Sequence, residues 1–196
     1  MRLRELGALL ALDVLVNNCD RLPLIWDNQG NAGNVMLGLH DGQVIAIDSQ
    51  IICIDPALHP VNLDAYIAKV DALLAALTSK PSVEDARVHS VRKVIMQHTD
   101  YDVGEAGSVE IQRGLLAVVA ATADSGAGDP SFRDESKAWI DALRAYDPPL
   151  VGVDLISIDF LSRTWQCLQK YSAAAAAALA LASDATAVIG AADTSS

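Results

Sequence analysis

The chain has 196 residues, and 25 acidic side chains against 14 Lys and Arg give it a formal net charge of −11. A surface this acidic repels nucleic-acid phosphates and anionic lipid, which excludes nucleic acid and membrane surfaces as expected partners. Its three separated cysteines form no cluster with histidine. The sequence therefore predicts neither a zinc site nor a disulfide framework, and it favours a reducing, cytoplasmic location.

The first quarter of the chain predicts a helix, a long loop and a hairpin, in that order. An apolar run over residues 6–16, broken by Asp13, predicts a buried helix and lacks the cleavage pattern of a signal peptide. Residues 17–33 are rich in Asn, Gly and Pro and predict a shaped loop. Two apolar runs, 35–39 and 44–47, flank an Asp-Gly pair, which is typical of a β-hairpin.

The remainder of the chain predicts helices. Apolar residues indicate them over residues 63–77, 83–98, 109–123 and 132–146, and a long last helix is expected over residues 154–182. Ser82 is the expected N-cap of the second of these helices. The expected fold class is mainly α with a small β-hairpin, in one domain over residues 1–183. Its helical remainder covers 60–183, and residues 184–196 are expected to be a disordered tail.

Three acidic or amide side chains occur where the first predicted elements meet. Asp20 follows the first helix, Asn34 begins the first β-run and Asp48 ends the second. Because a hairpin brings its two ends together, Asn34 and Asp48 are expected to lie close in space. Phosphoryl transfer needs one carboxylate to orient the attacking hydroxyl, and carboxylate and amide oxygens to hold Mg²⁺ against the nucleotide phosphates. The trio therefore predicts the catalytic and metal-binding half of a protein-kinase-like site over residues 12–50.

Each of these residues alone has a simpler interpretation. Asp and Asn are common turn residues, and Asp20 by itself would more often be a turn residue than a catalytic one. The combination across a hairpin is more specific than any single position. His89 and His98 lie nine residues apart on a predicted helix, which is not the spacing of two ligands on adjacent turns.

Residues 12–50 resemble the kinase superfamily, in the variant where Asp20-Arg21 stands in the catalytic loop. Residues 12–26, followed by Asn28, Gly30-Asn31 and Gly33-Asn34, resemble the actin-fragmin kinase family more closely. The shared feature is a long insertion between the Asp-Arg pair and the metal-binding Asn. That family has an atypical protein-kinase fold and phosphorylates actin on threonine.

The resemblance implies a role for each site residue. Asp20 would be the catalytic base, with Arg21 beside it as a structural or phosphate-side partner, and Asn34 and Asp48 would bind the cofactors ATP and Mg²⁺ as metal ligands. Asn18 is expected to be a turn residue, although it could orient the loop. The implied activity is protein Ser/Thr phosphorylation, with actin or an actin-binding complex as the protein partner.

Two departures from the kinase pattern limit what the resemblance implies. Asp48 is followed by Ser49-Gln50 in place of Phe-Gly, which keeps the metal ligand and removes the glycine of the activation segment. Nineteen residues precede Asp20, too few for the Gly-rich loop and Lys of a kinase small lobe. The expected fold is thus the C-terminal, large lobe with the N-terminal lobe absent, and little activity is expected of this chain alone.

Two other functions stay open from the sequence. A kinase-derived lobe without catalytic activity could act as a protein-binding module. The Asp-Arg order is also shared with lipid kinases and their relatives, so a small-molecule or lipid acceptor is the third alternative.

Overall fold

Seven α-helices and one antiparallel hairpin make up the part of the chain that the computed structural model describes, residues 2–38, 43–48, 50–124, 130–145 and 156–192. The helices are α1 (Leu3–Val16), α2 (Pro60–Ser79), α3 (Ala86–Thr99), α4 (Gly104–Ala121), α5 (Pro130–Arg144), α6 (Ile158–Lys170) and α7 (Ser172–Ala192). The strands are β1 (Val35–Leu37) and β2 (Val44–Ala46), and short 3-10 helices occur at η1 (Ala32–Asn34) and η2 (Thr122–Asp124). The predicted class, mainly α with a small hairpin, is confirmed.

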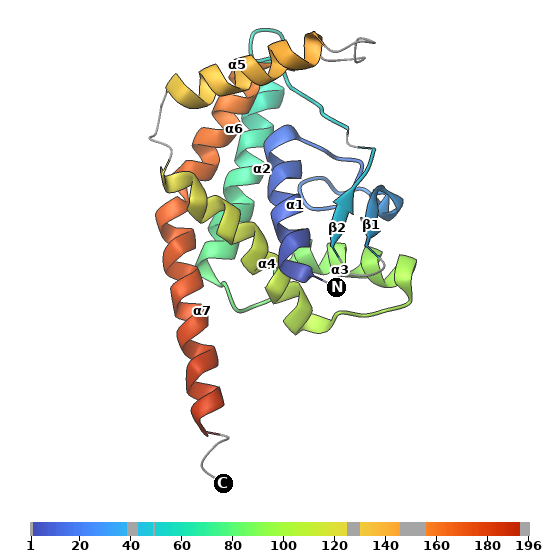
Figure 1. Cartoon of the computed structure of the whole chain (residues 1–196), viewed down its shortest axis with the longest axis vertical. Coiled ribbons are helices and arrows are strands. Elements are labelled where there is room, and N and C mark those ends of the chain that lie inside the picture. The colour runs from blue at the N-terminus through green and yellow to red at the C-terminus, as the bar shows by residue number, and fades with distance from the viewer. Residues whose placement is uncertain (1, 39–42, 49, 125–129, 146–155, 193–196) are drawn as a thin grey trace.

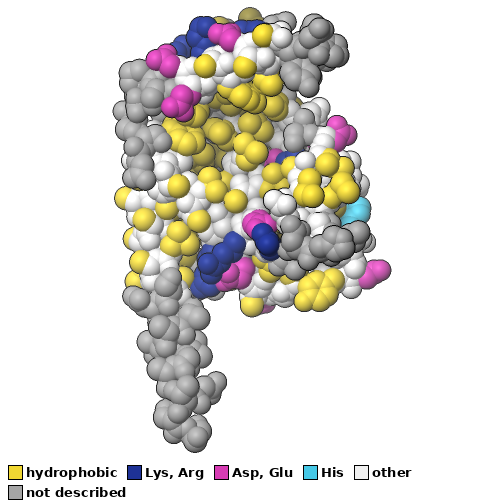
Figure 2. Space-filling model, in the orientation of Figure 1, with side chains coloured by type: hydrophobic (Ala, Val, Ile, Leu, Met, Phe, Trp, Pro, Cys, Tyr) yellow, Lys and Arg dark blue, Asp and Glu magenta, His cyan; other side chains and the backbone are white. Residues whose placement is uncertain are grey.

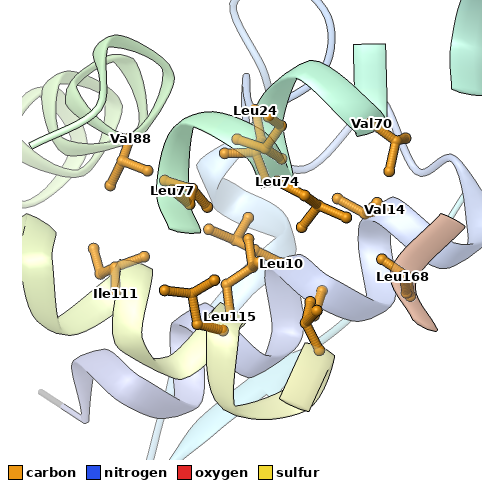
Figure 3. Packing of buried hydrophobic residues seen from close by; sticks show 14 of the residues in the cluster. Leu10, Val14, Leu24, Val70, Leu74, Leu77, Val88, Ile111, Leu115 and Leu168 are labelled. Atoms are coloured by element: carbon orange, nitrogen blue, oxygen red, sulfur yellow. The ribbon is translucent and has the colours of Figure 1, made fainter. Parts of the chain in front are cut away.

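Helix α1 lies between the hairpin on one side and helices α2 and α6 on the other, and α3 lies beneath the hairpin (Figure 1). Its apolar face carries Leu10 and Val14, which pack against Leu74 of α2 and Leu115 of α4 in the buried core (Figure 3). No helix in the described ranges is long and apolar enough to cross a membrane. The central position of α1 matters for the site, because the predicted catalytic loop begins where this helix ends.

Two glycines allow α1 and α4 to cross with their backbones in contact. A Cβ atom added to Gly7 would lie 2.0 Å from the carbonyl oxygen of Ile111, and one added to Gly114 would lie 2.0 Å from that of Arg4. No side chain fits at such distances, so glycine is required at both positions. The crossing fixes the axis of α1 against the rest of the helical body.

The hairpin packs on the N-terminal half of α1. Val35 pairs with Ala46, and the backbone N–H of Val44 donates to Glu5 of α1 over 3.3 Å. The strands are three residues long each, shorter than the predicted runs, and the predicted Asp41-Gly42 turn lies outside the described residues. The end of the hairpin where β1 begins and β2 ends thus lies beside the loop after α1.

The predicted helix boundaries differ from the observed ones by several residues, most at α4, which begins at Gly104 and not at residue 109. Helix α3 begins at Ala86 and is capped by Asp85, which accepts from the backbone N–H of Arg87 over 2.9 Å, so Ser82 is not the cap. The predicted last helix is two helices, α6 and α7, separated at Tyr171, whose backbone (φ −101°, ψ 0°) departs from helical geometry. Helix α7 continues to Ala192, through the start of the tail expected from residue 184.

Candidate functional site

The loop after α1 starts with a sharp change of direction at Asn17. This residue has a left-handed backbone (φ 51°) that ends the helix, which asparagine tolerates better than most residues. Its side chain accepts a hydrogen bond from Trp26 Nε1 over 2.7 Å and donates to the carbonyl of Ile52 over 3.0 Å. Trp26 also stacks on Tyr66 with ring centroids 6.1 Å apart.

The structure brings the predicted trio together at the base of the hairpin. The side-chain amide of Asn34, which is buried, donates to Asp20 Oδ2 over 2.7 Å and to the backbone carbonyl of Asp48 over 3.4 Å. The backbone of Asp48 is left-handed (φ 49°), and its side chain is exposed at the end of β2. The predicted proximity of Asn34 and Asp48 is therefore confirmed, and Asp20 lies in contact with the same amide.

Arg21 is buried behind the trio, with 1% of its side chain exposed. Its guanidinium pairs with Asp13 of α1, and its Nε–H donates to the carbonyl of Asn34 over 3.4 Å. Burial raises the pKa of the Asp13 carboxyl, and the Arg21 charge and a 3.0 Å hydrogen bond from Asn18 act in the opposite direction. Of the two roles left open for Arg21, this geometry supports the structural one.

Asp13 is the functional residue that sequence reasoning missed. In the sequence it only interrupts an apolar run, whereas in the structure it is the acidic partner that holds Arg21 in place. A charged residue inside the apolar face of a buried helix was the available signal, since a buried charge requires a partner of opposite sign.

Three further asparagines connect the loop to the trio. Asn18 Oδ1 accepts from the backbone N–H of Asp20 over 3.2 Å, which confirms the predicted turn. Asn28 donates to the carbonyl of Cys19, and the backbone N–H of Asn31 donates to the carbonyl of Arg21 over 3.0 Å. The insertion between Asp20 and Asn34 therefore folds back and holds the backbone on both sides of Asp20.

The donor set fits a magnesium ion. Asp20, Asp48 and Asn34 offer carboxylate and amide oxygens, and Mg²⁺ takes one or two carboxylates and keeps several waters. No group of three or more His, Cys, Asp or Glu side chains suited to a metal occurs in the described ranges, so a site built only from protein ligands is not indicated there. The Oδ1 atom of Asn34 accepts a hydrogen bond from the side-chain amide of Asn31 over 3.2 Å. This hydrogen bond would be replaced by the bond to the cation when a metal ion binds.

The outer face of the hairpin is apolar and exposed beside these polar groups. Met36 and Ile45 are cross-strand neighbours that are 51% and 43% exposed, and Ile47, next to Asp48, is 40% exposed. Figure 2 shows hydrophobic side chains gathered over this part of the molecule. An apolar surface of this kind, directly beside a polar cluster, is typical of a binding site.

The comparisons with known proteins point to one family. A family model described as "Actin-fragmin kinase, catalytic" matches residues 1–119, from α1 into α4, which includes Asp20, Asn34 and Asp48. A Dictyostelium discoideum protein named for actin-fragmin kinase is 30% identical over 120 residues, which make up 59% of this chain and 29% of that protein. The match thus spans less than a third of the relative's length.

Proposed function

The chain belongs to the actin-fragmin kinase catalytic family, and on that premise we propose that its site transfers the γ-phosphoryl group of ATP, with Mg²⁺, to a Ser or Thr hydroxyl of a protein. We further propose that the fold is the large lobe of a protein-kinase-like domain. The observation that carries both proposals is the Asn34 amide, which contacts Asp20 and Asp48 at once.

Asp20 is the proposed catalytic base. The Oδ2 atom of Asp20 accepts a hydrogen bond from Asn34. The Oδ1 atom of Asp20 is therefore the one that would accept a hydrogen bond from the substrate hydroxyl. In the reaction, the hydroxyl oxygen forms a bond to the γ-phosphorus, the bond from that phosphorus to the ADP oxygen breaks, and the hydroxyl proton passes to Asp20. Arg21 is given a positioning role. Its guanidinium is buried against Asp13 of α1, and this ion pair anchors the loop on which Asp20 lies.

Asn34 and Asp48 would hold the magnesium ion. When bound, the ion supplies positive charge against the phosphate oxygens, which is the main requirement of phosphoryl transfer. The nucleotide base is proposed to bind on the exposed apolar face formed by Met36, Ile45 and Ile47. This face adjoins Asp48, and its apolar surface suits a planar ring. Actin or an actin-binding complex is the proposed acceptor, and the name of the Dictyostelium relative supports it.

Nucleotide binding tests this function without requiring turnover. We expect Mg·ADP to bind the wild-type chain in a calorimetric titration, and Asp48→Ala to lower the affinity by about 10- to 100-fold, the range typical even of outer metal-shell changes. Glu105→Ala is the matched control, because Glu105 is an exposed carboxylate on α4 outside the site, and it should bind like the wild type.

Two outcomes would contradict the proposal. Equal Mg·ADP affinities for the wild type and Asp48→Ala would exclude Asp48 as a metal ligand. No nucleotide binding by the wild type at millimolar concentration would favour the other function that the sequence leaves open, a binding module without catalysis.

A further inference from the structure

Asn31 lies where the insertion after Asp20 meets the first strand, and its backbone joins the two. Its N–H donates to the carbonyl of Arg21 over 3.0 Å, and its own carbonyl accepts from the backbone N–H of Asn34 over 3.0 Å. Arg21 is the neighbour of the proposed base, and Asn34 is a proposed metal ligand. The main chain alone therefore fixes the place of Asn31 between the two halves of the site.

The side-chain amide of Asn31 has a defined orientation. Its Oδ1 atom accepts from the backbone N–H of Gly33 over 3.2 Å, which makes Asn31 the N-cap of η1. A backbone N–H only donates, so the oxygen of the Asn31 amide faces Gly33 and its NH₂ group faces elsewhere. That NH₂ group donates to Oδ1 of Asn34 over 3.2 Å. The direction of the bond between the two asparagines is thus set by the main chain.

The amide of Asn34 is fixed from its other end as well. Its NH₂ group donates to a carboxylate oxygen of Asp20 and to the backbone carbonyl of Asp48. Both of these oxygens accept, so the Asn34 oxygen points the other way, toward Asn31. Asn34 is 5% exposed. A buried amide oxygen that loses its donor is costly, so the bond from Asn31 stabilises this arrangement.

The oxygen that Asn31 holds is the one that the proposed function assigns to Mg²⁺. Because the NH₂ group of Asn34 faces Asp20 and Asp48, Oδ1 is the atom of this amide that remains for a cation. The hydrogens of the Asn31 NH₂ group carry partial positive charge, and a cation at the same oxygen would repel them. The hydrogen bond and the metal therefore compete for one atom.

We propose that Asn31 is a positioning residue that holds the Asn34 oxygen in the metal-free chain and yields it to Mg²⁺, and that this exchange lowers the affinity of the site for the metal. The inference rests on the proposed function, because it takes Asn34 as a ligand of the metal used there. It adds a means of regulation to the same site. Removal of the Asn31 NH₂ group should destabilise the metal-free chain and, in the opposite sense, strengthen Mg²⁺ binding.

Asn31→Ser separates the two functions of this side chain. A serine hydroxyl still accepts from the N–H two residues further on, although more weakly, but it has no NH₂ group to donate to Asn34. The backbone bonds of Asn31 do not involve its side chain, and the residue is exposed, so the fold should persist, as circular dichroism would check.

Calorimetric titrations of ADP at a series of Mg²⁺ concentrations measure the effect. In Asn31→Ser, half-maximal ADP binding should need about two- to tenfold less Mg²⁺ than in the wild type, the factor that corresponds to one neutral hydrogen bond. In EDTA, the wild type and the variant should bind ADP equally. Urea unfolding in EDTA should show a lower midpoint for the variant. A merely structural role would give lower stability without tighter metal binding.

Asn28→Ser is the matched control on the same loop. The Asn28 side chain is also exposed and donates to the backbone, at the carbonyl of Cys19. This variant should lower the urea midpoint as well, because it also loses one neutral hydrogen bond. It should not lower the Mg²⁺ requirement, since the lost bond does not involve the Asn34 oxygen.

Nuclear magnetic resonance of the wild type provides a measurement that depends on no variant. The side-chain NH₂ signals of Asn31 and Asn28 are assigned through their own backbone resonances. We expect Mg·ADP to speed the exchange of the Asn31 NH₂ hydrogens with water, because their hydrogen bond to Asn34 is lost. The exchange of the Asn28 NH₂ hydrogens should stay the same.

The outcomes separate this inference from the proposed function. An equal or higher Mg²⁺ requirement in Asn31→Ser, or unchanged exchange of the Asn31 NH₂ group, would overturn the inference even where Mg·ADP binds the wild type and Asp48→Ala weakens it. An equally lowered Mg²⁺ requirement in Asn28→Ser would assign the effect to a looser loop and overturn it too. A wild-type chain that binds no Mg·ADP at millimolar concentration would overturn both the inference and the proposed function.

Discussion

The crossing of α1 with α4 and the loop that follows α1 are held together by different kinds of interaction. At the crossing, two glycines bring the helix backbones into contact and apolar side chains are buried beside them, while one exposed ion pair, Arg4 with Glu110, also joins the two helices. In the loop, asparagine side chains bond to the backbone, and one buried ion pair anchors the whole segment to the helix. The rigid crossing sets the position of the loop, and the loop's own polar bonds set the position of Asp20.

This difference predicts which substitutions destabilise each region. Apolar packing at the crossing depends on shape, so a single added carbon should be enough to disturb it. The loop depends on pairing, so loss of one charged partner should cost more than loss of one neutral hydrogen bond. The largest effect is therefore expected at the ion pair between Arg21 and Asp13, which joins the loop to α1.

Arg21→Met should lower the free energy of unfolding by about 3–5 kcal/mol at neutral pH, because it leaves the Asp13 carboxylate buried without its partner. Urea denaturation measures this loss. The double variant Arg21→Met/Asp13→Leu removes both charges and should recover most of it. If the double variant is no more stable than Arg21→Met, the loss comes from packing around Arg21 and not from the unpaired charge.

The same variant should respond to pH. Burial raises the pKa of Asp13 above its ordinary value of 3.8, and removing the Arg21 charge should raise it further. A carboxyl with a higher pKa in the folded chain binds more protons there than in the unfolded chain, so its contribution to stability falls as pH rises above 3.8. The difference in stability between wild type and Arg21→Met should therefore shrink on acidification and grow toward neutral pH.

Gly114→Ala should cost about 3 kcal/mol, the upper end of what overpacking usually costs, since its new Cβ would lie 2.0 Å from the carbonyl oxygen of Arg4. Gly104→Ala is the matched control. Gly104 has a positive φ of 69° with nothing within 4 Å of its Cβ position, so this change should cost only the strain of the left-handed backbone, about 1–2 kcal/mol. Similar losses in thermal unfolding would show that the crossing tolerates a methyl group.

The sequence predicts those parts of the site that follow from local pattern. Two apolar runs around an Asp-Gly pair predict the hairpin, and the hairpin itself brings Asn34 near Asp48. Pairings across elements are not visible in the same way: nothing near Asp13 indicates that Arg21, eight residues later, turns back to meet it. The break at Tyr171 is also not visible in the sequence, because no Gly or Pro occurs there.

The smallest effect is expected for a neutral hydrogen bond of the loop. Asn28→Ala removes the bond to the carbonyl of Cys19 and should cost about 1 kcal/mol of global stability, the usual net value of such a bond. Its local effect should be larger: the backbone amides of residues 19–21 should exchange with deuterium faster than in the wild type, while those of α1 and α4 keep their protection. Asn62→Ala, at an exposed asparagine of α2, is the control and should leave this exchange unchanged. Faster exchange throughout α1 in Asn28→Ala would instead mean that the loop and the helix crossing open as one unit, so that the position of the loop is not set by its own polar bonds.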